Sequence, residues 1–282
     1  MPRFSAIAVI TRLTFREAAR RWVLWVALAL GVLFLIIYGI GFHEIEKDIA
    51  RQAHGGNALL ATEMHSFFLL AGMYVVNFLT SLMTVLTSVD TLSGEIASGT
   101  IHTVISKPVP RWQIVFGKWL GFTGMLSLYL LLMAGGVTAV GYIVSGTLLP
   151  NLPQGCVLMW LTILILLGVS LLGGTRLSTL ANGVMVFGLF GIAFIGGWIE
   201  QFGACMNSPA AVNVGIVTSL LLPSEAMWRR AAFAMQSPLV SAIGVSPFAS
   251  SSSPSQLMVG YAVLYLVVML YLAMRQFSRR DL

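Results

Sequence analysis

The sequence has very little charge. Only 9% of its 282 residues are Asp, Glu, Lys or Arg, whereas 57% are hydrophobic. Soluble domains carry about 25% charged residues, so this chain lacks the charge that would cover a water-exposed surface. A bilayer removes that need, because its interior solvates apolar side chains and penalises charged ones. The composition therefore indicates an integral membrane protein and argues against a soluble enzyme.

Several chemical motifs are also missing. The two cysteines, Cys156 and Cys205, have no zinc-type spacing. They read as isolated small apolar residues, with a disulfide left open. No basic run is interleaved with aromatic residues, so we expect no nucleic-acid partner. The chain has no Walker A loop, because Gly117-Lys118 is followed by Trp119. We therefore expect neither a bound nucleotide or other cofactor nor a catalytic residue in this chain.

What the sequence does contain is long apolar runs. Six of them approach or exceed the roughly 20 residues that cross the hydrocarbon core as a helix. They lie at about 22–40, 66–88, 119–144, 157–175, 180–199 and 257–274. Lipid offers no hydrogen-bond partner to the backbone, so each span must pair its own N–H and C=O groups by forming a helix. The sequence therefore predicts an all-α membrane protein, a six-helix bundle forming one domain over 1–282. No charged residue is expected in the core of a span, which argues against a proton relay.

The region 201–256 is harder to interpret. Two apolar patches, 211–222 and 238–249, are too short to span and suit re-entrant segments better. Eight spans would result if both crossed, and six is the favoured number. Pro223 and Ser224 predict the start of a short helix, through a fixed φ and an N-cap oxygen. Glu200, at the end of the fifth span, is expected at the membrane interface.

The basic residues predict the topology. Most of the 16 Lys and Arg fall in the N-terminal segment, the loop after the second span, the turn after the fourth and the C-terminus. The positive-inside rule therefore places both termini in the cytoplasm. Residues 1–21 form either a basic collar or an amphipathic helix lying in the interface. On the other side, His43, Glu44, Glu46 and Asp48 read as an acidic solvated loop rather than a metal site.

The loop 90–118 carries charge in a chain that otherwise avoids it. Asp90 and Glu95 follow the second span, and Gly99-Thr100 permits a turn. Beyond the turn, apolar residues at i, i+3 and i+4 predict a short amphipathic helix that prolines terminate: Ile101, Val104, Ile105, then Pro108 and Pro110. Such a helix suits docking to a cytoplasmic protein, and the alternative is an ordinary connecting loop.

This loop also carries a resemblance. The strings Gly-Glu-x-Ala-Ser-Gly-Thr-Ile (94–101), Ser-Lys-Pro-Val-x-Arg (106–111) and Gly-Lys (117–118) resemble those of type-2 ABC transporter permeases, the exporter-type permeases. Within that family the chain is most similar to permeases akin to the one encoded beside nitrous-oxide reductase maturation genes. The stretch 221–230 resembles one in the same relatives.

The resemblance implies a function and a set of partners. Such a permease moves a substrate, here unidentified, across the bacterial cytoplasmic membrane, and two copies or two related chains embedded in lipid form the path. Each copy docks a cytoplasmic ATP-binding subunit, which binds ATP and Mg. The implied docking residues flank or form a coupling helix at about 99–106: Glu95, Gly99, Thr100, Ile101, Val104, Lys107, Pro108 and Arg111. The implied outer gate, at about 211–234, includes Pro223, Glu225, Trp228 and Arg229.

Two other functions are weighed against this one. A secondary transporter or channel working alone would need mid-membrane charge or an internal repeat, and the sequence offers neither. A membrane-embedded enzyme would need clustered His, Asp or Glu within the spans, and these are absent from the sequence as well.

Overall fold

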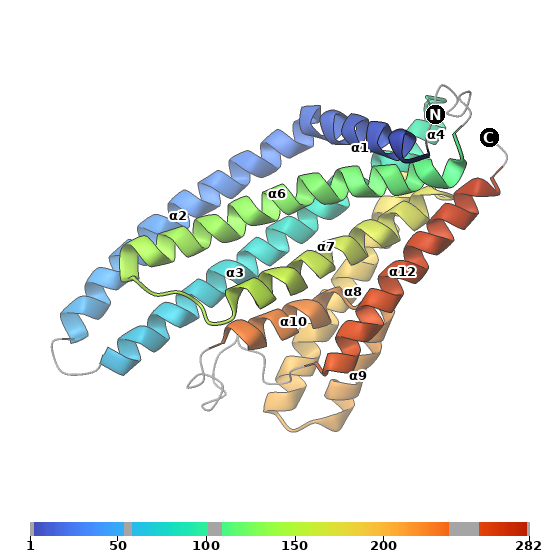
Figure 1. The fold of residues 1–282 in the computed structure, drawn as a ribbon. Helices are drawn as coiled ribbons and strands as arrows, with labels where there is room; N and C mark the ends of the chain where they lie inside the picture. Colours follow the sequence, from blue (N-terminus) through green and yellow to red (C-terminus); the bar gives the residue numbers. More distant parts are fainter. Residues whose placement is uncertain (1–2, 54–57, 101–108, 237–253, 281–282) are drawn as a thin grey trace.

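The computed structural model describes residues 3–53, 58–100, 109–236 and 254–280, and these segments are helical with no strand among them (Figure 1). The helices that cross or enter the bundle, in chain order, are α1 Arg3–Arg20, α2 Trp22–Ala53, α3 Ala58–Ser88, α4 Asp90–Ala97, α6 Arg111–Ser145, α7 Leu152–Gly174, α8 Thr179–Cys205, α9 Pro209–Leu221, α10 Ser224–Met235 and α12 Gln256–Ser278.

Six helices of the described chain are long and apolar enough to cross a membrane, which confirms the predicted all-α bundle. They are α2, α3 continued by α4, α6, α7, α8 and α12. The pair α9 and α10 is bent by 111° at its junction and is either a broken seventh span or a re-entrant hairpin. The second short patch, 238–249, lies outside the described residues.

The helices extend well beyond the apolar runs, and one expected loop is wrong. Residues 43–48 do not form a solvated loop, because α2 continues through them to Ala53. Ion pairs three residues apart support this extra length, from Lys47 to Glu44 at 2.7 Å and from Arg51 to Asp48 at 3.1 Å. No cluster able to hold a metal ion occurs among the residues described.

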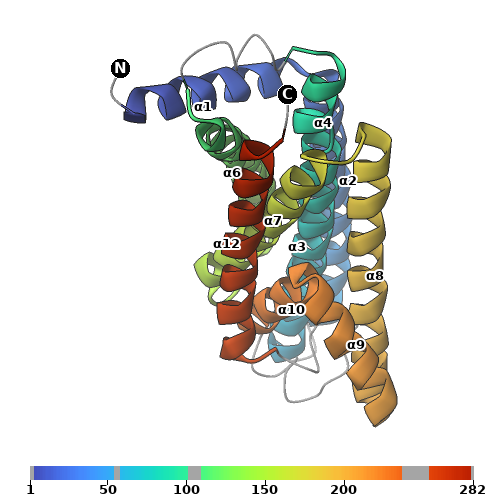
Figure 2. The same ribbon diagram turned by 90° about the vertical axis from the view of Figure 1, so that its right-hand side faces the viewer.

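Helix α7 forms the centre of the bundle. Its side chains are buried along most of its length, and α3, α6, α8, α10 and α12 surround it (Figures 1 and 2). By contrast, α2, α8 and α12 expose rows of large apolar side chains, including Ile36, Ile195 and Leu264. A bilayer would solvate these rows, so the exposed apolar surface fits a membrane-embedded bundle.

Helix α1 packs crosswise over the start of α6 (Figure 2). The close approach depends on small residues, because a Cβ on Gly121 would lie 2.9 Å from the carbonyl oxygen of Thr11. The Thr11 hydroxyl also donates to the Gly117 carbonyl at 3.2 Å. The N-terminal helix is thus fixed to the third span.

Polar side chains inside the bundle are satisfied locally or across helices. The threonines of α3 and α4 donate to carbonyls one turn earlier, at Thr80, Thr84, Thr87 and Thr91. The amide of Asn182, on α8, donates to the carbonyls of Val89 and Ser170, both at 3.0 Å. A buried amide in a span thus bonds the backbone of neighbouring segments.

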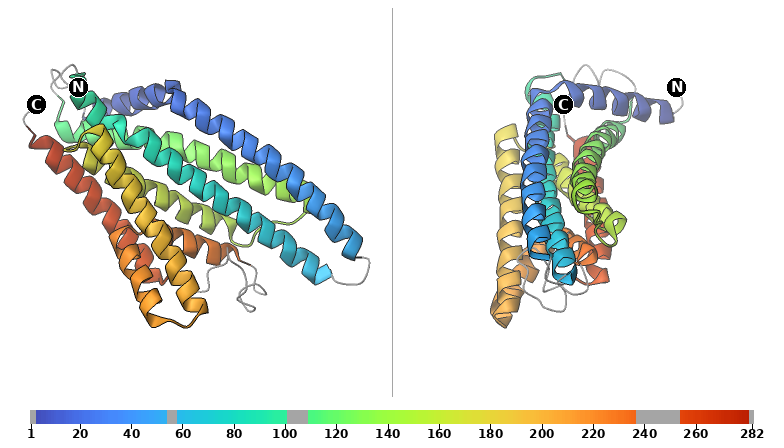
Figure 3. Two further views of the ribbon diagram at one scale, coloured as in Figure 1. Left: turned by 180° about the vertical axis from the view of Figure 1, so that it is seen from behind. Right: turned by 90° about the vertical axis from the view of Figure 1, so that its left-hand side faces the viewer.

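The two ends of the bundle differ. One end, which we call the terminal end, carries α1, α4 and the last turn of α12; the other, which we call the hairpin end, carries the α8–α9 connection (Figures 1 and 3). An even number of crossings brings the first and last helices to the same end of the bundle, and α1 and the last turn of α12 both lie there (Figure 1).

Candidate functional site

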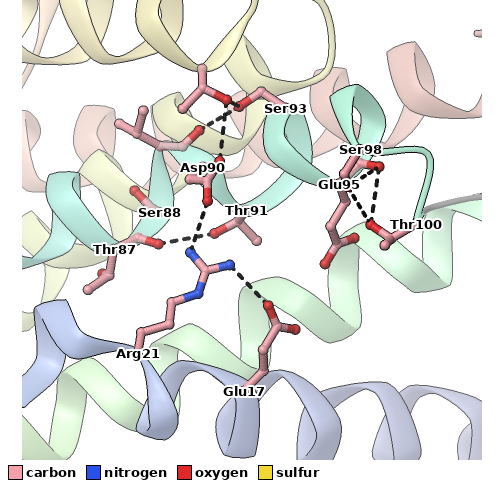
Figure 4. Close-up of polar contacts among 12 residues, drawn as sticks. Glu17, Arg21, Thr87, Ser88, Asp90, Thr91, Ser93, Glu95, Ser98 and Thr100 are labelled. Atoms are coloured by element: carbon pink, nitrogen blue, oxygen red, sulfur yellow. Dashed lines mark hydrogen bonds and ion pairs between the residues drawn. The ribbon is translucent and has the colours of Figure 1, made fainter.

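At the terminal end, a polar cluster ties three helices together, α1, α4 and α8 (Figure 4). Helix α4 follows α3 after a turn at Val89, and its first residue, Asp90, lies 3.6 Å from Arg21. Arg21 also pairs with Glu17 at 3.0 Å. On the opposite side, Thr179 at the start of α8 donates to Asp90 at 3.3 Å. The start of α4 is therefore connected to α1, to the junction between α1 and α2, and to α8.

The far part of α4 is connected to the third span. Glu95 forms an ion pair with Lys118 of α6, and Lys118 is only 5% exposed. The Glu95 side chain is itself 18% exposed, so the structure places this predicted docking residue mostly inside the bundle rather than on its surface. A movement of α4 would be transmitted to α6 through this pair.

The turn after α4 has the predicted glycine geometry. Gly99 has φ +72°, a left-handed conformation that favours glycine. Beside it, the hydroxyls of Ser98 and Thr100 lie 2.8 Å apart, and Thr100 donates to the Glu95 carbonyl at 3.4 Å (Figure 4). The chain thus leaves α4 through an ordered turn that exposes Thr100 and leaves Gly99 half-buried.

The remaining predicted docking residues are placed only in part. Arg111 begins α6, and its guanidinium donates to the Arg280 carbonyl, which links the third span to the end of α12. Ile101, Val104, Lys107 and Pro108, and with them most of the predicted coupling helix, lie outside the described residues.

At the hairpin end, α9 runs back along α8 as its antiparallel neighbour (Figure 1). Glycines allow the contact: a Cβ on Gly215 of α9 would lie 2.8 Å from the Gly196 carbonyl oxygen of α8. A Cβ on Gly203 would lie 3.1 Å from the Val212 nitrogen. Position 215 thus faces position 196, and position 212 faces position 203. This antiparallel pairing shows that α9 returns toward the middle of the bundle.

A charged pair is buried where α8, α9 and α10 meet. Arg229 of α10 forms an ion pair with Glu200 of α8, and the two residues are 3% and 4% exposed. Arg229 also donates to the Ser219 hydroxyl of α9 at 3.0 Å. One guanidinium therefore joins all three helices.

This pair adds protein burial to what the sequence indicated for Glu200. Glu200, expected at the membrane interface, is buried within the protein rather than exposed at the end of its span, and Arg229 is buried with it. The cause is that α8 continues to Cys205, which leaves Glu200 a full turn inside the helix, and α9 and α10 fold over it. The signal that sequence reasoning missed was the need of Arg229, in an apolar hairpin, for an acidic partner.

The other predicted gate residues lie in the same region. Glu225 is buried next to Gly197, where an added Cβ would lie 3.2 Å from the Glu225 carboxyl carbon. The Trp228 ring is 5.5 Å from that of Tyr74, which accepts a hydrogen bond from Trp198 at 3.2 Å. Helix α10 begins at Ser224 as expected, but its N-cap is Pro223, and the expected cap hydrogen bond from a side chain is not formed.

Hydrogen bonds from α7, from the residue before it and from α12 also hold the hairpin formed by α9 and α10. Thr162 of α7 donates to the Ser224 carbonyl at 3.2 Å, and Asn151 donates to the Ala234 carbonyl at 3.2 Å. From α12, Tyr261 and Tyr265 donate to the carbonyls of Leu220 and Leu221, at 2.6 and 3.1 Å. The bend between α9 and α10 is thereby fixed below the surface of the hairpin end.

These features define a class of protein: a multi-span helical membrane protein with a polar, α4-centred cluster at one end and a charged, bent helix pair, α9 and α10, at the other. The family follows from comparison with known proteins. Residues 8–282 match the model of the ABC-2 family transporter protein, and the chain belongs to that family. No curated protein matches the chain at a significant level.

Proposed function

We propose that this chain is the membrane-spanning subunit of an ATP-driven exporter in the bacterial cytoplasmic membrane. The observation that supports it most is the ABC-2 family match over residues 8–282, nearly the whole chain. ATP and Mg are bound by a separate cytoplasmic subunit, since this sequence carries no phosphate-binding loop. The substrate is chemically undefined, and the resemblance to the permeases of nitrous-oxide reductase maturation is a proposal about subgroup alone.

The ATP-binding subunit docks at the terminal end, on the segment 95–111. Its movement on binding nucleotide displaces α4 and the turn at Gly99 and Thr100. The contacts already described would carry this displacement onward: Glu95 to Lys118 on α6, and Asp90 to Thr179 on α8. Nucleotide then shifts the population between two arrangements of the spans, because it binds one of them more tightly.

The α9–α10 hairpin serves as the outer gate. It includes Pro223, Glu225, Trp228 and Arg229. Glu200 of α8 belongs to the gate as well, because its ion pair with Arg229 keeps the hairpin against α8 in the closed state. A second copy of the chain, or a related permease, completes the path. Opening requires the hairpin to leave α8, so the buried ion pair must separate or move as a unit.

We expect both termini on the cytoplasmic side and the hairpin end outside. Cys205 is exposed at the hairpin end, so a membrane-impermeant maleimide should label it in intact cells. A cysteine placed at the opposite end by Ser98→Cys, in a Cys156→Ser, Cys205→Ser background, should label only after permeabilisation. Labelling of the Ser98→Cys variant in intact cells would contradict this topology.

An associated ATPase is the central test of the proposal. Affinity purification of the full chain in mild detergent should recover a Walker A protein, identified by mass spectrometry, and the complex should hydrolyse ATP. A Walker A lysine-to-alanine variant of that partner is the matched control and should bind without hydrolysis. Failure to recover an ATPase under any nucleotide condition would contradict the proposal. Transport by the reconstituted chain without ATP would instead favour a secondary transporter or channel.

A further inference from the structure

A pocket at the terminal end is lined by three arginines. It has a volume of about 460 Å³ and lies between the ends of α7 and α12. Its lining combines Arg176, Arg275 and Arg279 with apolar side chains of both helices, among them Leu172, Leu177 and Leu272. Among the residues that the structure describes, none that lines it is acidic.

These three arginines differ from the other two at the same place. Arg111 donates to the Arg280 carbonyl, and Arg280 donates to the Thr175 carbonyl, so both are engaged in holding helix ends together. Within the described part of the chain, the guanidinium groups of Arg176, Arg275 and Arg279 form neither a hydrogen bond nor an ion pair. Three cationic groups thus converge on one pocket with their donors available.

The face of α12 below the pocket is apolar. Leu264, Val268 and Tyr271 are 60%, 41% and 56% exposed, and they share one helix face with Arg275 and Arg279 at helical spacing. Leu272 belongs both to this exposed row and to the pocket. The surface therefore changes from apolar to cationic along one face of α12, toward the terminal end of the bundle.

We propose that this pocket binds the headgroup of an anionic phospholipid, whose acyl chains lie along the exposed face of α12. Guanidinium groups bind phosphate oxygens through paired N–H donors, and basic pockets beside spans hold anionic headgroups in this way. The apolar row below supplies the surface that acyl chains need. A soluble phosphate would use the arginines but gain nothing from that row.

The alternative reading is that the arginines only offset the negative helix C-termini and follow the positive-inside rule. That reading predicts a general attraction to anionic lipid, in which removing any basic residue at this end weakens lipid binding by the same amount. The pocket predicts a loss confined to its own three arginines.

The test uses the full chain purified in detergent and titrated with phosphatidylglycerol, with lipid retention read by native mass spectrometry. Wild-type protein should retain phosphatidylglycerol in preference to phosphatidylcholine. The triple variant Arg176→Gln, Arg275→Gln, Arg279→Gln should bind phosphatidylglycerol at least about tenfold more weakly. The control variant Arg12→Gln, Arg16→Gln, Arg20→Gln removes the same charge from α1, outside this pocket, and should bind as wild type does.

A second variant keeps the result interpretable. Replacing the three pocket arginines with lysine preserves charge but removes the paired donors, so binding should return only in part. An unfolding midpoint equal to that of wild type in this variant excludes a general folding defect. Equal losses in the triple variant and the control would overturn the proposal. So would full competition by millimolar inorganic phosphate, which would indicate a simple anion pocket. Loss of a bound ATPase without any loss of lipid would assign the arginines to that subunit instead.

Discussion

Replacing Arg229 with methionine should destabilise the protein by about 3–5 kcal/mol, because the change leaves Glu200 charged and buried without its partner. Both residues are almost completely inaccessible to solvent, and Arg229 is the group that joins α8, α9 and α10. Thermal unfolding in detergent, followed by tryptophan fluorescence, should show the loss as a large fall in the midpoint. Vesicles carrying the variant should also leak a small fluorescent dye, since the hairpin is no longer held to α8.

The neighbouring arginine provides a matched control. Arg230 donates to the Pro254 carbonyl at 2.5 Å and is only half-buried, so Arg230→Met should cost much less. The double variant Glu200→Gln, Arg229→Met removes both charges and should recover part of the stability that the single variant loses. If Arg229→Met and Arg230→Met were equally stable, the buried pair would not be what holds the hairpin.

Reversing the charge of Glu95 to lysine should weaken coupling to the ATP-binding subunit, because it opposes two cations across the α4–α6 contact. The pair is mostly buried, so its loss should cost about 1.5–3 kcal/mol, the range for hydrogen bonds to charged groups. Lys118→Glu should have a similar effect. The swap Glu95→Lys, Lys118→Glu should restore both the unfolding midpoint and the ATPase activity of the purified complex.

This cycle separates two roles for Glu95. If the residue acts by positioning α4 through Lys118, the swap rescues activity as well as stability. Rescue of stability without rescue of ATPase activity would show that Glu95 contacts the docked subunit directly, and would contradict the positioning role. Glu17→Lys is a useful comparison, because that residue lies in the same polar cluster but is more exposed, with a side chain 52% accessible.

Much of the fold could be predicted from local pattern. Each span was located by the length of its apolar run, and the 111° bend falls at Leu222 and Pro223, where an apolar run too short to cross meets a proline. Helix ends were predicted less well. The segment 43–48 is polar, so it suggested a loop, but ion pairs one turn apart and the packing of α2 on α3 keep it helical.

The candidate sites divide in the same way. The turn at Gly99 could be predicted, because glycine is the residue that favours a left-handed conformation and this preference does not depend on any distant part of the chain. The partners of Glu95, Arg111 and Arg229 could not, because each lies on another helix, up to 169 residues away in the case of Arg111. A charged residue in a sequence shows that a partner is needed, and not which one.

The sequence by itself determined that this protein is a six-span helical membrane bundle, because hydrophobic length and the need for internal backbone hydrogen bonds act within each segment. Only the tertiary structure decided that Glu200 and Arg229 meet inside the hairpin, that Glu95 faces Lys118, and that three arginines converge between α7 and α12. Those pairings arise from helix packing, where glycine contacts and crossing positions set which side chains face one another.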